Sequence, residues 1–158
     1  MTPIGIENEI YFFRANEQWG EFSNLYQRSI EFENREYPTA EHAYQAGKPK
    51  REVVREWLLN APHPCLVAIV GNYLPTWEIV PNFSQIKYAR MRAVLRAKFS
   101  QHEDLRQLLL SSGDARLIEA PRTDNSVNRE WGAIKGKGKN MLGLLLMELR
   151  SELRQAHS

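Results

Sequence analysis

The residues best suited to chemistry lie between Thr39 and Lys48, where a carboxylate and an amine recur at helical spacing. Offsets of three, four and seven residues share one face of an α-helix. Such a face would carry Glu41, Tyr44 or Gln45, and Lys48. A carboxylate and an amine so placed can serve as an acid/base group and as an amine nucleophile or phosphate contact. On this segment alone, a solvated polar face without a ligand is the favoured alternative.

A second candidate is the glycine-rich stretch before the last predicted helix. Lys135, Lys137 and Lys139 alternate there with glycines, and glycines let backbone N–H groups approach an anion. The stretch lacks the Gly-Lys-Ser/Thr of a P-loop and does not follow a strand, as a dinucleotide fingerprint does. It predicts either a phosphate cradle or an exposed loop.

A third candidate is Trp19–Tyr26, which interleaves aromatic residues with small polar ones. Aromatic rings can stack on a flat heterocycle while Ser and Asn hydrogen-bond its edge. Taken by itself, the segment favours a simpler interpretation, a turn held by core aromatics.

Charge is distributed unevenly, although the net charge is only +2. Residues 1–41 hold three arginines against eight glutamates, and the remainder is basic. No acidic residue occurs from Ile79 to His102. That stretch contains Lys87, Arg90, Arg92, Arg96 and Lys98. Such clusters suit phosphate groups, but they are also common on solvated helix faces.

The length of 158 residues suits one core, so we expect a single domain over residues 1–158. Hydrophobic and charged shares of 42% and 25% exclude disordered, collagen-like and coiled-coil proteins. No apolar run reaches the roughly 18 residues that span a bilayer, and no basic segment precedes an apolar core at the N-terminus. We therefore expect a cytoplasmic protein with no membrane partner. A single cysteine and four scattered histidines exclude an internal disulfide and a structural zinc cage.

Strands are the first elements that must position these residues. Glu9–Arg14 is rich in β-forming residues, and Ser29–Tyr37 predicts two short strands turning at Glu33-Asn34, because Asn tolerates left-handed backbone. Ala115–Ala120 predicts a further strand, followed by a polar loop through Arg129. A loop of that length favours a functional role.

Helices are predicted from capping residues, prolines and apolar periodicity. They cover Thr39 to about Lys48, Lys50–Asn60, Gln85–Phe99, Glu103–Ser112 and Asn140–Gln155. The apolar face expected for the second helix holds Val53, Val54, Trp57 and Leu58. Cys65–Val70 fits a helix or a strand. The predicted fold class is α+β, mostly helical, with a small N-terminal antiparallel sheet.

Taken together, these motifs resemble the NADAR family of YbiA-like N-glycosidases over about residues 11–150. The matching pieces in the first part of the chain are Glu21-Phe22-Ser23-Asn24, Tyr37–Ala46 with Lys48, Lys87 with Met91, and Lys98-Phe99. Those in the second part are Gly113-Asp114-Ala115, Ile118-Glu119, Asp124, Trp131-Gly132, Gly138, Asn140, Leu142-Gly143, Leu146-Met147 and Arg150. Several separated motifs in family order are far more specific than any one of them.

The resemblance implies a compact YbiA-like α+β fold and cleavage of an N-glycosidic bond between a ribose and a base or amine. Activities of the family include hydrolysis of phosphorylated ribosylamino-pyrimidines, which are riboflavin intermediates, and removal of ADP-ribose from guanine in DNA. The implied partner is thus a phosphorylated ribosyl compound, with ADP-ribosylated DNA as the alternative substrate. A non-catalytic module that binds NAD or ADP-ribose is the alternative from another class.

The same resemblance implies the site. Its catalytic residues would be Glu41, Lys48 and Asp124, with neither metal nor cofactor required. Its substrate-binding residues would be Phe22, Ser23, Asn24, Tyr44, Trp131, Gly132 and Asn140. The sequence departs from the family pattern at Glu33-Asn34, where Asp-Gly is usual, at Asn72, where Arg is common, and at Phe83, where Trp is usual. These departures bear on which base is recognised, and the oligomeric state stays open.

Overall fold

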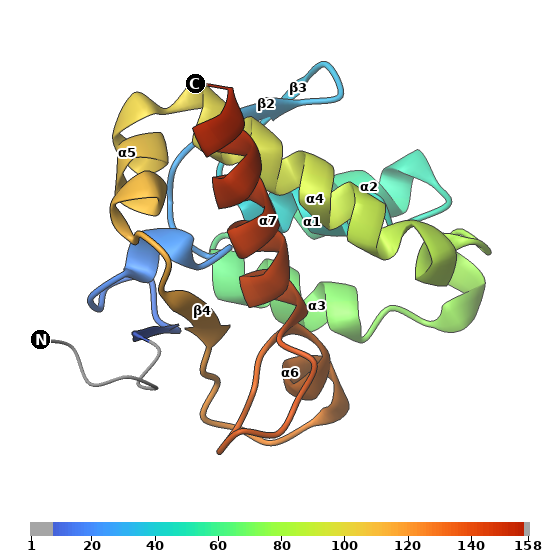
Figure 1. Cartoon of the computed structure of the whole chain (residues 1–158). Coiled ribbons are helices and arrows are strands. Elements are labelled where there is room, and N and C mark those ends of the chain that lie inside the picture. The colour runs from blue at the N-terminus through green and yellow to red at the C-terminus, as the bar shows by residue number, and fades with distance from the viewer. Residues whose placement is uncertain (1–7, 157–158) are drawn as a thin grey trace, which may run out of the picture. The chain divides into compact units, whose positions relative to one another are not determined.

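The computed structural model describes residues 8–156, which are mostly helical (Figure 1). The chain divides into two compact units. One is continuous and spans Asn24–Gln101, and the other combines the residues up to Ser23 with those from His102 onward. The predicted α+β class with predominant helices is confirmed. No helix within residues 8–156 has the length and apolar character needed to cross a membrane.

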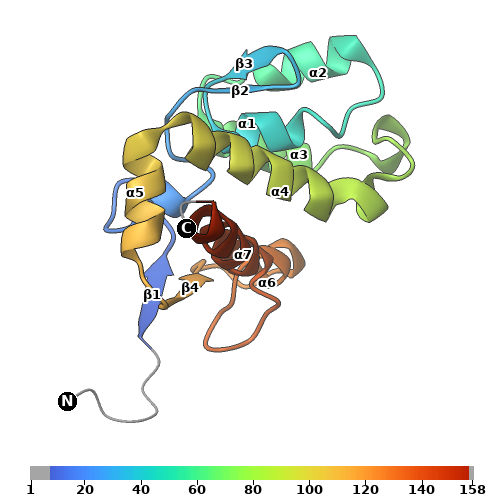
Figure 2. The same ribbon diagram turned by 45° about the horizontal axis from the view of Figure 1, so that its top comes forward.

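The continuous unit begins with a hairpin and ends with a long helix. Its elements are β2 (Ile30–Phe32), β3 (Arg35–Tyr37), α1 (Ala40–Gln45), α2 (Glu52–Leu59), α3 (Pro64–Asn72), a 3₁₀ turn (Thr76–Glu78) and α4 (Phe83–Gln101). Figure 2 shows the hairpin, α1 and α4 side by side, and their contacts agree with this view. The small antiparallel sheet that the sequence predicts is thus present as β2 and β3.

The hairpin turns at the predicted residues. Glu33 and Asn34 have φ angles of 50° and 63°, so both lie in the left-handed region that matches the twist of paired strands. The Glu33 carboxylate accepts a hydrogen bond from Arg90 of α4, which also donates to the backbone oxygens of Ala43 and Tyr44 at 2.6 and 3.1 Å. Arg90 therefore ties the hairpin turn to the carboxyl end of α1.

Helix α1 is short and buried on every side. The Thr39 hydroxyl caps its start by accepting the His42 N–H at 3.2 Å, as the sequence predicts. The helix ends at Gln45 rather than at Lys48. All six of its residues are buried, because α3 and α4 both pack against it. The alternative of a solvated polar face is therefore wrong.

The apolar face predicted for α2 is wrong at two positions. Val53 and Trp57 are 68% and 63% exposed, and Leu58 is the buried residue of this helix. Polar contacts hold α2 instead, since Arg55 donates to the backbone oxygens of Ala46 and Pro49. The segment that fitted a helix or a strand is helical, with Pro64 in the first turn of α3.

The basic stretch from Ile79 to His102 does not form one exposed cluster. Lys98 is fully buried, with its Nζ 5.7 and 5.2 Å from the ring centroids of Tyr26 and Phe99. Arg90 is engaged at the end of α1. Two of the five cations expected to attract phosphate therefore serve the packing of α4.

The discontinuous unit joins two distant parts of the chain. Its elements are β1 (Glu9–Phe12), a 3₁₀ turn (Gly20–Phe22), α5 (Glu103–Ser111), β4 (Arg116–Glu119), α6 (Ser126–Trp131) and α7 (Met141–Gln155). β1 and β4 pair in parallel, with Glu9 opposite Arg116. α7 packs against β4 and α5, and its leucines form the core together with Leu117.

One feature of this unit confirms a prediction made from the sequence, and another corrects one. Gly113 follows α5 at φ 63°, which confirms the predicted left-handed end of that helix. The predicted polar loop through Arg129 contains the short helix α6 instead. Asn125 caps α6 by accepting the Asn128 N–H at 2.8 Å, and this local signal was missed.

Candidate functional site

Glu41 is a carboxylate held inside α1. Its side chain is nearly buried, at 9% exposure, and its Oε1 accepts a hydrogen bond from Gln45 Nε2 at 2.7 Å. The four-residue spacing puts the two side chains on one helical face. The backbone N–H of Glu41 donates to the Asn24 oxygen at 3.0 Å, which fixes the start of the helix.

Burial decides the proton affinity of this carboxylate. Removal from water raises the pKa of Glu41 above its ordinary value of 4.5, while the Gln45 hydrogen bond and the positive charge of Lys48 lower it. The effect of burial is the largest of the three, so the pKa of Glu41 is raised overall. A carboxylate with a perturbed pKa next to an amine is a common property of catalytic sites.

Lys48 lies just beyond α1 and is also nearly buried. Its Nζ donates to the Gly71 oxygen at 3.1 Å and to Asn72 Oδ1 at 3.2 Å. The rings of Tyr44 and Phe83 have their centroids 5.7 and 5.6 Å from the same nitrogen. The amine thus lies between two aromatic rings and two oxygen acceptors.

The backbone around Lys48 is held as well. The Lys48 oxygen accepts the Val80 N–H at 2.9 Å, and the Lys50 N–H donates to the Glu78 oxygen at 2.8 Å. These bonds flank an antiparallel bridge between Pro49 and Ile79. The turn that carries the amine is therefore anchored on both sides.

The site is shaped by Gln45, which the sequence offered as an alternative to Tyr44 on the helical face, and by Gly71, which the sequence did not assign to it. A Cβ on Gly71 would lie 2.1 Å from Gln45 Oε1, so only glycine leaves room for the Gln45 amide there. The Gln45 oxygen has no hydrogen-bond partner among the described residues. Gln45 has the right spacing to Glu41 in the sequence, but nothing in the sequence pairs it with Gly71.

Asn72 and Phe83, two positions at which this chain departs from the family pattern, both contact the Lys48 amine. The structure therefore places these departures at the site rather than on a remote surface.

Glu41→Gln is expected to be at least as stable as the wild type, with an advantage that grows from pH 4 to pH 8. Because burial raises the folded-state pKa, the folded protein keeps this proton to higher pH than the unfolded chain. The resulting stabilisation is complete below the unfolded value near 4.5 and is lost as pH rises through the folded pKa. A glutamine at this position has no such loss. Urea unfolding midpoints at pH 4, 6 and 8 measure the difference.

Glu103→Gln is the matched control for this experiment. The hydrogen bond from Gln107, followed by one from Arg106, lowers the pKa of Glu103, so its ionised form is the stabilised one. This variant should lose stability relative to the wild type as pH rises from 3 to 7. A Glu41→Gln advantage that is constant or shrinks with pH would contradict the burial effect.

The aromatic segment Trp19–Tyr26 is anchored by its rings. The Phe22 ring stacks on Trp19 at 5.5 Å between centroids and meets Phe12 edge-on at 5.7 Å. Ser23 and Asn24 are buried, and Asn24 Nδ2 donates to Met91 Sδ at 3.3 Å. The Asn24 Oδ1 atom is buried without a hydrogen-bond partner among residues 8–156.

Asp124 lies in the loop before α6 and is half exposed. Its two carboxylate oxygens accept from Arg129 Nε and Nη2 at 2.6 and 2.7 Å. This hydrogen-bonded ion pair lowers the pKa of Asp124. The carboxylate therefore stays ionised at neutral pH.

Trp131, Gly132 and Asn140 lie near the carboxyl end of β4. Asn140 has left-handed backbone at φ 51°, and its side chain accepts the Glu119 N–H at 3.0 Å and donates to the Leu117 oxygen at 2.9 Å. Gly132 accepts the Asn140 N–H at 3.1 Å. Both polar atoms of the Asn140 amide thus bind β4, and its predicted contact with substrate stays a prediction.

The structure brings together Glu41, Tyr44 and Lys48 in the unit Asn24–Gln101. Asn24 belongs to the same unit and binds the start of α1. The other predicted site residues belong to the discontinuous unit: Phe22, Ser23, Asp124, Trp131, Gly132 and Asn140.

Known proteins match the sequence and the fold over nearly the whole length of this chain. The chain is 40% identical to "N-glycosidase YbiA" of Shigella flexneri over 145 residues, which cover 91% of this chain and 88% of that protein. It is 32% identical to "Riboflavin biosynthesis protein VVA0006" of Vibrio vulnificus (strain YJ016) over 151 residues, or 95% of this chain and 40% of that protein. The NMR structure of Escherichia coli YbiA matches with a TM-score of 0.81 and 36% identity, covering 96% of this chain and 88% of that one. The NADAR domain model matches residues 11–154. With this match and these relatives, the chain belongs to the NADAR domain family.

Proposed function

We propose that this protein is an N-glycosidase that hydrolyses the C–N bond between a phosphorylated ribose and a base or amine. The observation that carries the proposal is the buried Glu41 carboxylate, held by Gln45 and influenced by the Lys48 charge. The name of the Shigella flexneri relative supports the reaction class. The name of the Vibrio vulnificus relative supports ribosylamino-pyrimidine phosphates of riboflavin synthesis as the substrate class.

The chemistry of the reaction explains why such a site needs a carboxylate. Breaking a ribosyl C–N bond develops positive charge on the sugar and negative charge on the leaving base. An ionised Glu41 would stabilise the sugar cation or activate the attacking water. Lys48 would act as a hydrogen-bond donor or as an amine that condenses with the ring-opened sugar.

Asp124 has two candidate roles, binding of the ribose hydroxyls and service as a second acid/base group, and its ion pair with Arg129 favours the first. A general acid must hold a proton at working pH, and the Arg129 pair lowers the pKa of Asp124. Acceptance of hydrogen bonds from ribose hydroxyls needs only the ionised form. We therefore assign Asp124 to the ribose hydroxyls and Trp131 to stacking on the base.

The domain and the compartment follow the family. The family model covers both units without interruption, which supports one domain over residues 1–158. A cytoplasmic location suits a substrate that is a phosphorylated metabolite.

Mass spectrometry of the products tests the proposed reaction. Wild-type protein is incubated with a phosphorylated ribosylamino-pyrimidine and, separately, with an oligonucleotide carrying ADP-ribosyl guanine. Free base and ribose phosphate from the first substrate are the expected products. Cleavage of the oligonucleotide alone would identify an ADP-ribosyl-guanine glycohydrolase that acts on DNA. Cleavage of neither, together with binding of ADP-ribose, would identify a binding module and overturn the proposal.

Gln45→Leu should move the acid limb of the pH–kcat profile to higher pH. The Gln45 hydrogen bond lowers the pKa of Glu41, so its loss raises that pKa further and delays ionisation of the carboxylate. Steady-state kinetics between pH 4 and pH 9 measure the shift. A variant that only loosens the fold would lower kcat equally at every pH.

Gln107→Leu is a closely matched control. Gln107 Nε2 donates to Glu103 Oε1 at 2.9 Å, so the same pair of residue types at the same spacing lies on an exposed face of α5. This variant should leave the pH–kcat profile unchanged. An identical profile for Gln45→Leu would remove Gln45 from the positioning of Glu41.

A further inference from the structure

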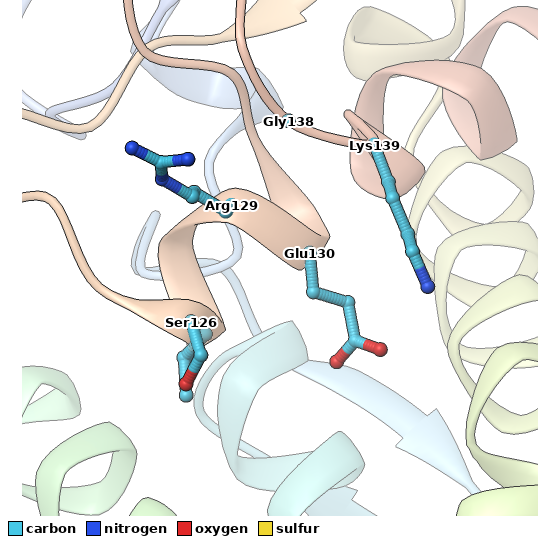
Figure 3. Close-up of a pocket in the computed structure, with 6 residues that line it drawn as sticks. Ser126, Arg129, Glu130, Gly138 and Lys139 are labelled. Atoms are coloured by element: carbon cyan, nitrogen blue, oxygen red, sulfur yellow. The ribbon is translucent and has the colours of Figure 1, made fainter.

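A hollow of about 510 Å³ lies in the discontinuous unit, between α6 and the glycine-rich loop that precedes α7. Its lining residues are Ser126, Val127, Arg129, Glu130, Gly138 and Lys139 (Figure 3). Ligand pockets in proteins commonly have volumes of about 300–1,000 Å³, so a small molecule fits this one. Lys139 belongs to the glycine-rich stretch that the sequence offered as a phosphate cradle, and none of the six residues is among the site residues that the family resemblance implies.

The two walls of the hollow are fixed to each other. The Lys139 N–H donates to the Arg129 oxygen at 2.6 Å, and the Asn140 N–H donates to the Gly132 oxygen at 3.1 Å. Gly138 has a φ of 140°, and a Cβ there would lie 2.3 Å from the Gly132 oxygen. The loop therefore rests directly on the backbone of α6 and of Gly132, which follows it.

The lining combines groups of opposite character. Figure 3 shows the side chains of Glu130 and Lys139 extending in the same direction, while Arg129 points away from them. Arg129 is held by both oxygens of Asp124, which neutralises its charge. The amine of Lys139 is therefore the main cation of the lining. The Ser126 hydroxyl adds a donor, and Val127 adds an apolar wall.

The local charge favours an anion. Lys135 and Lys137 are exposed in the same loop as Lys139, so this part of the unit has an excess of positive charge. A site for a bare anion would not include the carboxylate of Glu130, because like charges repel. A carboxylate is a good acceptor for hydroxyl groups. The lining thus suits a molecule that carries both an anion and hydroxyls.

We propose that this hollow binds a sugar phosphate, with Lys139 on the phosphate and with Glu130 and Ser126, which lie to one side of the Lys139 amine in Figure 3, on the sugar hydroxyls. The assignment rests on the proposed function in one respect, since a phosphorylated ribose is the proposed substrate. It adds the residues that recognise the phosphorylated part. Phosphate of a small sugar and phosphate of a nucleic-acid backbone share this chemistry, and the test below separates them.

Binding is measured by NMR titration of the backbone amides, because this readout does not depend on turnover. The probes are ribose 5-phosphate, ribose, inorganic phosphate and an unmodified oligonucleotide, each added to the full chain. Ribose 5-phosphate should shift the amides of residues 126–139 and bind at least 10-fold more tightly than ribose. It should also bind more tightly than inorganic phosphate. Shifts confined to other residues, or stronger binding of the oligonucleotide than of ribose 5-phosphate, would overturn the proposal.

Substitutions then test the named side chains. Lys139→Gln and Ser126→Ala should weaken binding of ribose 5-phosphate about 10-fold and several-fold, while Glu130→Gln should reduce its advantage over inorganic phosphate. Lys135→Gln is the matched control, since Lys135 is an exposed lysine of the same loop that does not line the hollow. It should change affinity less than 2-fold. Equal losses for Lys139→Gln and Lys135→Gln would show diffuse attraction by loop charge and overturn the assignment.

The binding and activity measurements together separate failure of the proposed binding site from failure of the proposed N-glycosidase activity. If the wild type cleaves no ribosyl substrate but ribose 5-phosphate binds as described, the proposed function is rejected and the sugar-phosphate site in the hollow is supported. If the wild type cleaves its substrate and Lys139→Gln leaves KM unchanged, the proposed reaction is supported and the proposed sugar-phosphate site in the hollow is rejected.

Discussion

Glu41→Gln should lower kcat at least about 1,000-fold while the protein keeps its fold and its affinity for ligand. The side chain is nearly buried, and its shape is almost unchanged by the substitution. The glutamine oxygen can still accept the hydrogen bond that Gln45 now donates to Oε1. The variant therefore removes the negative charge and the basicity of the group while the surrounding contacts stay in place.

Single-turnover assays of product formation measure this loss, and ligand titration measures binding in the same preparations. Glu103→Gln is the control, because Glu103 accepts a hydrogen bond from Gln107 at the same four-residue spacing, on an exposed face of α5. It should keep wild-type turnover. Normal turnover in Glu41→Gln would exclude Glu41 as the carboxylate of the reaction.

Substitution of Lys48 should produce the second large loss, about 100-fold or more in kcat for Lys48→Met. The amine is nearly buried and donates to the Gly71 oxygen and to Asn72 Oδ1. Its charge also lowers the pKa of Glu41, so the acid limb of the pH–kcat profile should move to higher pH in this variant. Lys50→Met is the control, since Lys50 is exposed and only two residues away.

Lys48→Arg separates the two roles of the amine. Arginine keeps the positive charge but cannot form an imine with an aldehyde. If Lys48 acts by charge and hydrogen bonding, Lys48→Arg should recover part of the lost rate. If its Nζ attacks C1′ of the ring-opened ribosylamine, an imine to Lys48 forms as the bond from C1′ to the base breaks and the base leaves as the protonated amine; Lys48→Arg should then be as slow as Lys48→Met. Borohydride should then reduce the imine and add the mass of the sugar to Lys48 under turnover conditions. Wild-type rates in Lys48→Met would exclude both roles.

Local signals in the sequence predicted local structure well. The Thr39 cap, the turn at Glu33 and Asn34, and the left-handed residue after α5 all depend on contacts within a few residues. The long last helix was also predicted, since its leucines repeat with helical spacing and most of them are buried in the structure. The shared face of Glu41 and Gln45 was predicted for the same reason, whereas Lys48, predicted on that helical face, lies beyond the end of α1.

Contacts between distant residues could not be predicted from one sequence. Burial of α1 depends on packing by α3 and α4, and the sequence of α1 alone favoured a solvated face. The fit of Gln45 against Gly71 joins residues 26 positions apart and depends on the absence of a side chain. Lys98 was placed among the phosphate-attracting cations because it belongs to a basic stretch without acidic residues, whereas in the structure it is fully buried beside the rings of Tyr26 and Phe99.

The parallel pairing of β1 with β4 has a consequence for how the protein is made. Arg116 lies 107 positions after its partner Glu9, so β1 emerges from the ribosome long before the strand that completes its ladder. At synthesis rates of about 5–20 residues per second, β1 stays without its partner strand β4 for roughly 5–20 s. All of the segment Asn24–Gln101 emerges in that interval, and most of its contacts are internal. Translation therefore favours an order in which the segment with the Glu41 carboxylate folds first and the discontinuous unit is completed last.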